Sequence, residues 1–377
     1  MKELENIVAE AERARSSGQS VALATVVDVE GSAYRLPGAR MLIANGKWIA
    51  GSISGGCLED DVVMRAQEAI AKDQALVTTY DTTSDDDIVF GVGLGCKGII
   101  TILIEPIREE DERVDFLGFA KSCLEDRTPG VVATVIRVQG RTAAKAGSRF
   151  VSRLEERRSD VADRDLESKI EAAIRVMPQA AKLMTFSLEH GAANVFVERI
   201  EPPTPLVVFG AGHDAIPVVR LAKELGWHVT LVDHRPAYAT AARFPLADRV
   251  LIGTPSELSS KVTLTPDTLA LVMTHNYLRD LELLQILLPA PVRYLGLLGP
   301  RRRTDQLLAD LQEKGIRPTA DQLSRFYGPV GLDIGSEGPI EVALSILSEM
   351  QAVMTSHPGG HLKERKRPIH HDLVGIE

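Results

Sequence analysis

The feature that most constrains the fold is a glycine-rich turn between a short apolar strand and an apolar helix. Leu206–Phe209 predicts a buried strand, and Gly210 and Gly212 open the helix that follows. A second strand, His228–Val232, ends in Asp233, 21 residues after the second glycine. Such glycines let a backbone approach a pyrophosphate, the helix N-terminus attracts its charge, and the acid can hold a ribose hydroxyl. This order of elements predicts a Rossmann-type parallel sheet.

Two further strand-to-helix junctions continue the pattern. One apolar run ends just before His275, and another, Tyr294–Leu298, ends just before Gly299. In an open parallel sheet the ligand crevice lies beyond the carboxyl ends of the strands, and arginines there can clamp phosphate. The residues expected to line this crevice are Gly210, Gly212, His213, Asp233, His275, Gly299 and Arg301.

The glycine turn departs from a standard dinucleotide site. His213 and Asp214 place a titratable group and a negative charge where a pyrophosphate would lie, although an acid there also stabilises the first turn of a helix. Arg235 can either pair with Asp233 or favour a 2′-phosphate. Binding of NAD(P) therefore stays open at this point.

The N-terminal half contains a repeated segment. A shift of 109 positions aligns residues 24–40 with 133–149, and seven of the seventeen positions are identical. Each segment is followed later by an apolar strand that carries an acid, Ile102–Glu105 and Val195–Glu198. We infer an internal duplication, with coincidence among common strand residues as the alternative.

A duplication makes two further predictions. Residues 21–107 and 131–200 should have the same strand order, and the charged stretch Arg153–Arg175 should be a helix of the second copy. The second copy lacks counterparts of Gly55-Gly56-Cys57 and of Cys96. One copy therefore kept a site and the other became scaffold.

The most marked boundary is the proline-rich stretch Glu201–Pro205, which cannot continue a helix or a central strand. The chain is predicted to be an α/β protein, with a duplicated α+β region followed by a Rossmann-type parallel sheet. The expected parts are residues 1–107, 108–203, 204–355 and a tail, 356–377.

Composition excludes several classes of protein. An apolar fraction of 44% and a charged fraction of 25% are typical of a globular chain, and no apolar run is long enough to cross a membrane. A net charge of −9 argues against nucleic-acid binding, which depends on clustered lysine and arginine. Three cysteines and an acidic start without a signal pattern indicate free thiols and a cytoplasmic protein.

Several motifs in fixed order resemble the xanthine dehydrogenase accessory factor family, XdhC/CoxI. The N-terminal motifs are Pro37–Leu42, Gly51–Glu59 and Gly93–Cys96, and the C-terminal ones are Phe209–His213, Val232–Arg235, Arg243–Pro245, Thr274–Asn276, Tyr294–Arg302 and Gly328–Gly335. One departure is Lys97, where the family tends to have glycine.

The resemblance implies a carrier rather than a catalyst. It implies that the chain binds the molybdenum cofactor, a molybdopterin, and assists its sulfuration and insertion into a xanthine dehydrogenase-type molybdenum hydroxylase. A cysteine desulfurase is a candidate second partner, and a homo-oligomer is expected. The residues expected to contact the cofactor in the N-terminal half are Arg40, Gly55, Gly56, Cys57, Cys96 and Lys97.

The chemistry of these residues suits such a ligand. Glycines allow close backbone approach, Arg40, Lys97 or Arg301 can contact a phosphate, and the thiol of Cys57 is a candidate ligand for molybdenum, a soft metal. A glycine-cysteine turn can also be only tight packing, because cysteine is often buried. Two other classes of function stay open, an NAD(P)-dependent oxidoreductase and a nucleotide-binding regulatory protein.

Overall fold

The computed structural model describes residues 2–82, 98–107, 114–175, 181–257 and 261–366. The chain divides into two compact units, 1–202 and 203–377, so the division falls within the predicted proline-rich boundary. The finer division of the first unit after residue 107, and the tail from residue 356, stay predictions. No described helix is long and apolar enough to span a membrane.

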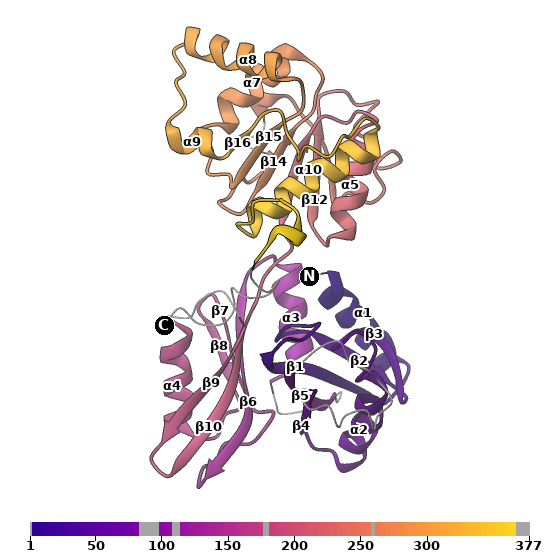
Figure 1. Cartoon of the computed structure of the whole chain (residues 1–377), viewed down its shortest axis with the longest axis vertical. Coiled ribbons are helices and arrows are strands. Elements are labelled where there is room, and N and C mark those ends of the chain that lie inside the picture. Colours follow the sequence, from indigo (N-terminus) through magenta and orange to yellow (C-terminus); the bar gives the residue numbers. More distant parts are fainter. Residues whose placement is uncertain (1, 83–97, 108–113, 176–180, 258–260, 367–377) are drawn as a thin grey trace. The chain divides into compact units, whose positions relative to one another are not determined.

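The first unit consists of two repeats of one design (Figure 1). The first repeat contains α1 (Lys2–Ser16), β1 (Val21–Gly31), β2 (Arg40–Ala44), β3 (Lys47–Gly51), α2 (Glu59–Lys72), β4 (Leu76–Asp81) and β5 (Gly98–Ile107). The second contains α3 (Phe116–Glu125), β6 (Gly130–Gly140), β7 (Arg149–Arg153), β8 (Glu156–Ser159), α4 (Arg164–Ile174), β9 (Lys182–Leu188) and β10 (Gly191–Ile200). The sheet orders are β3-β2-β1-β5-β4 and β8-β7-β6-β10-β9, which confirms the predicted identity of strand order.

The repeats also agree in strand register. Thr25 of β1 pairs with Arg40 of β2, and Thr134 of β6 pairs with Arg149 of β7, so both pairs are related by the 109-residue shift. Both long strands also bulge two residues after this threonine, against β5 and β10 respectively. Agreement at the level of a bulge supports duplication over coincidence.

Each sheet of the first unit is covered on both faces. Helix α2 packs on the outer face of the first sheet and α4 on the outer face of the second, while α1 and α3 pack together against the inner faces. Alternate side chains of β1 therefore enter different cores, with Ala22 and Ala24 toward α2 and Val21 and Leu23 toward α1. Burial on both faces explains the unbroken apolar run in this strand.

The prediction of one helix over Arg153–Arg175 is wrong in its first half. Residues 149–159 form the β7–β8 hairpin, and Leu154 adopts the left-handed conformation that a tight turn needs, with φ +53°. The helix begins only after Asp163, whose side chain accepts a hydrogen bond from the Leu166 amide. The exposed charged residues of β8 resemble a helix in composition because the strand lies at the sheet edge.

Two buried ion pairs join the inner faces of the two sheets reciprocally. Arg40 of the first repeat binds Glu198 of the second, and Arg149 of the second binds Glu105 of the first. None of these four side chains is more than 10% exposed. The Arg40 guanidinium also lies 4.2 Å from the ring centroid of Phe116. Each repeat thus supplies the counter-charge that the other buries.

The second unit has a six-stranded parallel sheet of order β13-β12-β11-β14-β15-β16 (Figure 1). Its elements are β11 (Pro205–Phe209), α5 (Ala215–Glu224), β12 (His228–Asp233), β13 (Arg249–Ile252), the 3-10 helix Pro255–Glu257, β14 (Leu269–Val272), α7 (Tyr277–Leu287), β15 (Tyr294–Leu297), α8 (Arg301–Glu313), α9 (Ala320–Ser324), β16 (Phe326–Tyr327), α10 (Pro339–Met354) and the 3-10 helix Leu362–Glu364. Helices α5 and α10 pack on one face, and α7 and α8 on the other. This confirms the predicted Rossmann-type fold.

The reciprocal ion pairs predict a specific pattern of stability. Arg40→Leu leaves the buried Glu198 carboxylate without its partner and should lower the free energy of unfolding by about 3 to 5 kcal/mol. The double variant Arg40→Leu/Glu198→Leu should recover most of this loss, because no unpaired charge remains. Urea denaturation of both variants and of Glu198→Leu measures the coupling. A double variant less stable than either single variant would contradict this account.

Candidate functional site

The loop before α2 is organised by a buried serine and a buried glutamate. The amides of Gly56, Cys57 and Leu58 all donate to the Ser54 hydroxyl oxygen, at 3.1, 3.1 and 3.2 Å. That hydroxyl donates to the Glu59 carboxylate, which also accepts from the Ser54 amide at 2.9 Å. Both side chains are almost fully buried. The turn is therefore held in one shape by the residues on either side of its glycines.

This ordered loop presents an open surface. Gly55 and Gly56 are exposed, the latter with φ +108°, and Cys57 is a half-buried free thiol. The ring of Tyr34, which is 65% exposed, lies beside Gly55, since a Cβ there would be 3.8 Å from the ring. Sequence reasoning missed Tyr34, because nothing in the pattern links it to a loop twenty residues later.

Arg40, which was also predicted for the N-terminal site, does not join this loop. Arg40 lies on the inner face of the first sheet, where Glu198 and the Gly38 carbonyl accept from its guanidinium. Its placement favours a structural role, because the loop and α2 cover the opposite face. Cys96 and Lys97 lie outside the described residues.

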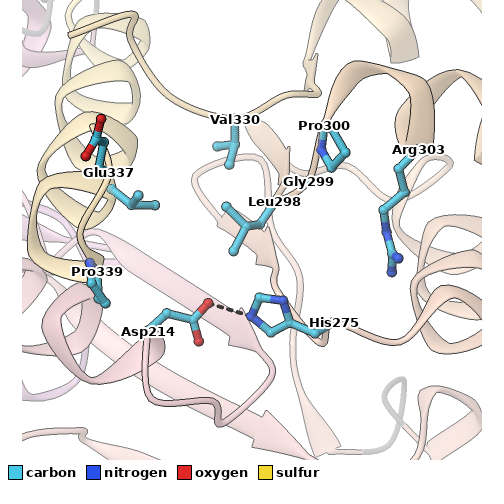
Figure 2. Close-up of a pocket in the computed structure, with 10 residues that line it drawn as sticks. Asp214, His275, Leu298, Gly299, Pro300, Arg303, Val330, Glu337 and Pro339 are labelled. Carbon is cyan, nitrogen blue, oxygen red and sulfur yellow. Dashed lines mark hydrogen bonds and ion pairs between the residues drawn. The ribbon is translucent and has the colours of Figure 1, made fainter. Parts of the chain in front are cut away.

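The second unit has a pocket of 460 Å³ at the carboxyl ends of its strands (Figure 2). Its lining residues are Asp214, His275, Leu298, Gly299, Pro300, Arg303, Val330, Glu337, Pro339 and Val342. The pocket thus contains two of the predicted crevice residues, His275 and Gly299. Arg301 and His213 are exposed and are not among the lining residues, whereas Arg303, the last of the three consecutive arginines, is.

An aspartate and a histidine form a pair on the wall of this pocket. His275 Nε2 lies 2.6 Å from Asp214 Oδ2 (Figure 2). The histidine adopts a left-handed conformation, with φ +56°, which is uncommon for a residue with a side chain. The Asp214 carboxylate lies against the glycine turn, because a Cβ on Gly212 would be 2.4 Å from its Oδ1. The pair therefore covers the turn where a pyrophosphate was expected.

A second carboxylate orders the adjacent wall. Asp280, which is 1% exposed, accepts from Arg303 Nη2 at 2.5 Å and from the Thr274 hydroxyl at 2.5 Å. Thr274 Oγ1 also accepts from the Asn276 amide at 3.1 Å, which fixes the backbone on both sides of His275. This network fixes the Arg303 guanidinium and the backbone at His275 on the side away from the pocket.

Asp233, the acid expected to hold a ribose hydroxyl, already accepts hydrogen bonds from groups of the protein. Asp233 accepts from the Ala211 amide at 2.7 Å, and from the Arg235 amide, Nε and Nη2 at 2.8, 3.0 and 2.7 Å. Burial raises the pKa of this carboxyl, but these hydrogen bonds outweigh burial and hold it below its ordinary value. The cavity beside Asp233 and Gly210 measures only 20 Å³. The Asp233 carboxylate therefore has no free acceptor position for a ribose hydroxyl.

Cysteine environments differ sharply between the two described thiols. Cys123, on α3, is fully buried, and burial raises the pKa of its thiol to about 11.

Within the described ranges, no three histidine, cysteine or acidic side chains gather in a way that could hold a metal ion.

Comparison with known proteins gives consistent matches over both units. A model of the XdhC and CoxI family matches residues 14–81, and a model of the XdhC Rossmann domain matches residues 206–350. A Bacillus subtilis (strain 168) protein, named as a probable subunit of xanthine dehydrogenase, is 34% identical over 332 residues, 88% of this chain and 92% of that protein. The molybdenum cofactor insertion chaperone PaoD of Escherichia coli (strain K12) is 23% identical over 340 residues, 89% of this chain and 84% of that protein.

A solved structure matches almost the whole chain. It is described as a xanthine dehydrogenase from Bacillus halodurans, has a TM-score of 0.75 and 28% sequence identity, and the match covers 93% of this chain and 96% of that chain.

The two described cysteines should react very differently. At pH 8 only on the order of one Cys123 thiol in a thousand is ionised, given a pKa near 11, whereas Cys57 lies in an exposed loop. Iodoacetamide should therefore modify Cys57 in the folded chain and Cys123 only after denaturation, as measured by mass spectrometry of tryptic peptides. A Cys57 that stays unmodified in the folded chain would show that the loop does not expose its thiol.

Proposed function

The chain belongs to the XdhC and CoxI family, and from this premise we propose that it binds the molybdenum cofactor and assists its maturation and insertion into a xanthine dehydrogenase-type molybdenum hydroxylase. The names of two relatives, a molybdenum cofactor insertion chaperone and a probable subunit of xanthine dehydrogenase, support this proposal. The observation that carries it is the ordered and exposed Gly55-Gly56-Cys57 loop.

The loop has the chemistry that a molybdopterin cargo needs. The exposed glycines allow close approach of a flat ring, and the exposed Tyr34 ring beside them can stack on it. The Cys57 thiol is a soft donor suited to molybdenum, the metal end of the cargo. Hydrogen bonds to Ser54 and Glu59 already order the loop, so binding of the cargo does not have to pay the entropy of ordering it.

Release is as important to a carrier as binding. A cargo held by one thiol, one ring face and two glycines can leave without unfolding any element, because Tyr34 and the glycines are exposed and Cys57 only packs against the edge of the core. Few fixed ligands also leave coordination positions of the metal open to a receiving enzyme. This arrangement supports a carrier more than a resident cofactor site.

Finer parts of the proposal come from the family resemblance. They are a cysteine desulfurase as sulfur donor, a homo-oligomeric state, a cytoplasmic location, and contacts to the cofactor from Cys96 and Lys97. In the second unit, His275, Gly299 and Arg301 are proposed as additional contacts.

An NAD(P)-dependent oxidoreductase is less well supported. In a dinucleotide site the acid after the second strand holds the ribose, but here the Asp233 carboxylate is saturated by Arg235 and the Ala211 amide. The Asp214 carboxylate also lies over the glycine turn. Both features oppose a bound dinucleotide.

Loss of the Cys57 thiol should reduce the cargo that the chain carries. After expression in a host that makes the cofactor, we expect Cys57→Ala to copurify with at least about tenfold less molybdenum and pterin than the parent chain, because one metal ligand is lost. Metal analysis and pterin fluorescence measure this. Cys123→Ala is the matched control and should retain the parent content. Unchanged retention by Cys57→Ala would remove this residue from the proposal.

Nicotinamide cofactors should not bind to the second unit. Titration of the chain into NADH should give no saturable change in nicotinamide fluorescence, because Asp233 is already paired and the Asp214 carboxylate lies over the glycine turn. A saturable change that disappears in Asp233→Asn would instead support the oxidoreductase alternative.

A further inference from the structure

The glycine turn of the second unit is poorly suited to hold an anion. The Ala211 amide donates to Asp233, so it is not available to a ligand. The Asp214 carboxylate adds a negative charge directly over Gly212. Pro217, in the first turn of α5, has no amide hydrogen. The usual phosphate position of this fold is therefore both occupied and repulsive.

The β14–β15 side of the same sheet has the opposite character. Its pocket contains His275 and Arg303, two side chains that can donate hydrogen bonds to an anion. Each is backed by its own carboxylate, Asp214 for the histidine and Asp280 for the arginine. Arg303 Nε is buried and has no hydrogen-bond partner among the described residues. The carboxylates fix both donors while leaving capacity for a ligand.

The pocket has a further acidic residue, Glu337, which does not lie beside His275 and Arg303. Glu337 is exposed, and Figure 2 shows its carboxylate on the opposite wall from His275 and Arg303. The wall also contains the start of α8, where the helix has Pro300 at its cap and no capping side chain. The positive end of the α8 dipole adds to the attraction for an anion but does not define the site by itself.

We propose that the second unit binds the phosphate group of its ligand between His275 and Arg303, and not at the Gly210–Gly212 turn. For the identity of the ligand, the phosphate of a pterin cofactor, the inference rests on the proposed function. The anion site itself is argued from the two donors and their carboxylates. Asp214 then has two roles, since it excludes anions from the turn and orients His275 toward the pocket.

The pairing with Asp214 also determines which ring nitrogen can meet a ligand. Nε2 lies 2.6 Å from the Asp214 carboxylate, so Nδ1 is the ring nitrogen available to a ligand. Nδ1 can donate to a phosphate oxygen when it carries a hydrogen. The charged and titratable groups around it are Asp214, Glu337, and Arg303 with Asp280 behind it.

Inorganic phosphate is a direct probe of this site in the full chain. Titration followed by amide and histidine-ring ¹⁵N NMR should shift the amide signals of Arg301–Arg303 and the ring ¹⁵N signals of His275. His275→Asn and Arg303→Lys should each weaken phosphate binding by roughly tenfold, the loss of one charge-assisted hydrogen bond. Arg303→Lys keeps the charge beside Asp280, and Arg302→Lys is the matched control that should leave affinity unchanged. Thermal unfolding checks that every variant is folded.

Two results would overturn the proposal. Shifts confined to residues 211–215 would place the anion at the usual turn, and a titration without saturable shifts would remove the site altogether. The outcome is independent of the carrier proposal, because phosphate binding can persist in a chain that retains no molybdenum. Equally, the Cys57 loop can retain cofactor when phosphate does not bind.

Discussion

The reciprocal pairing of Arg40 with Glu198 and of Arg149 with Glu105 is the interaction on which the first unit depends. A buried charge without its partner costs several kcal/mol, so neither sheet can keep its inner face without the other. Because both inner faces are used for packing, a functional site can only form elsewhere, and the loops before the outer helices α2 and α4 are available for it. The two repeats differ there: α4 begins at a simple cap, Asp163, whereas α2 begins after a glycine-cysteine loop. The shared framework thus allowed one copy to change its loop without changing its core.

The second unit uses paired carboxylates in two opposite ways. Asp233 is saturated by Arg235 and by the backbone, which closes the ribose side of the Rossmann sheet. Asp214 and Asp280 instead stand behind His275 and Arg303 and leave these donors turned toward the pocket. Aspartates therefore close the position for a ribose at Asp233 and fix the donors of the anion site at His275 and Arg303. A fold that usually binds dinucleotides is in this way reshaped for a different anion.

Much of the fold could be predicted because it depends on local patterns. The alternation of apolar runs with glycine turns predicts the parallel sheet, and the 109-residue shift predicts equal strand orders. The site was harder, because its contacts are distant in sequence. Arg40 meets its partner 158 positions away, so its position in a family motif suggested a ligand contact where the structure has an ion pair. The role of Glu59 in the loop depends on burial, which composition does not reveal. The charged composition of residues 153–159 predicts a helix, because an exposed edge strand and a solvated helix share that composition.

The central claim is that the chain carries the molybdenum cofactor to a hydroxylase. It is tested most directly by adding the cofactor-loaded chain to a cofactor-free xanthine dehydrogenase-type enzyme and measuring hydroxylase activity over time. The account predicts that activity appears in proportion to the loaded chain added, while molybdenum moves from the chain to the enzyme. Molybdenum that remains on the chain, with no activity gained by the enzyme, would contradict it.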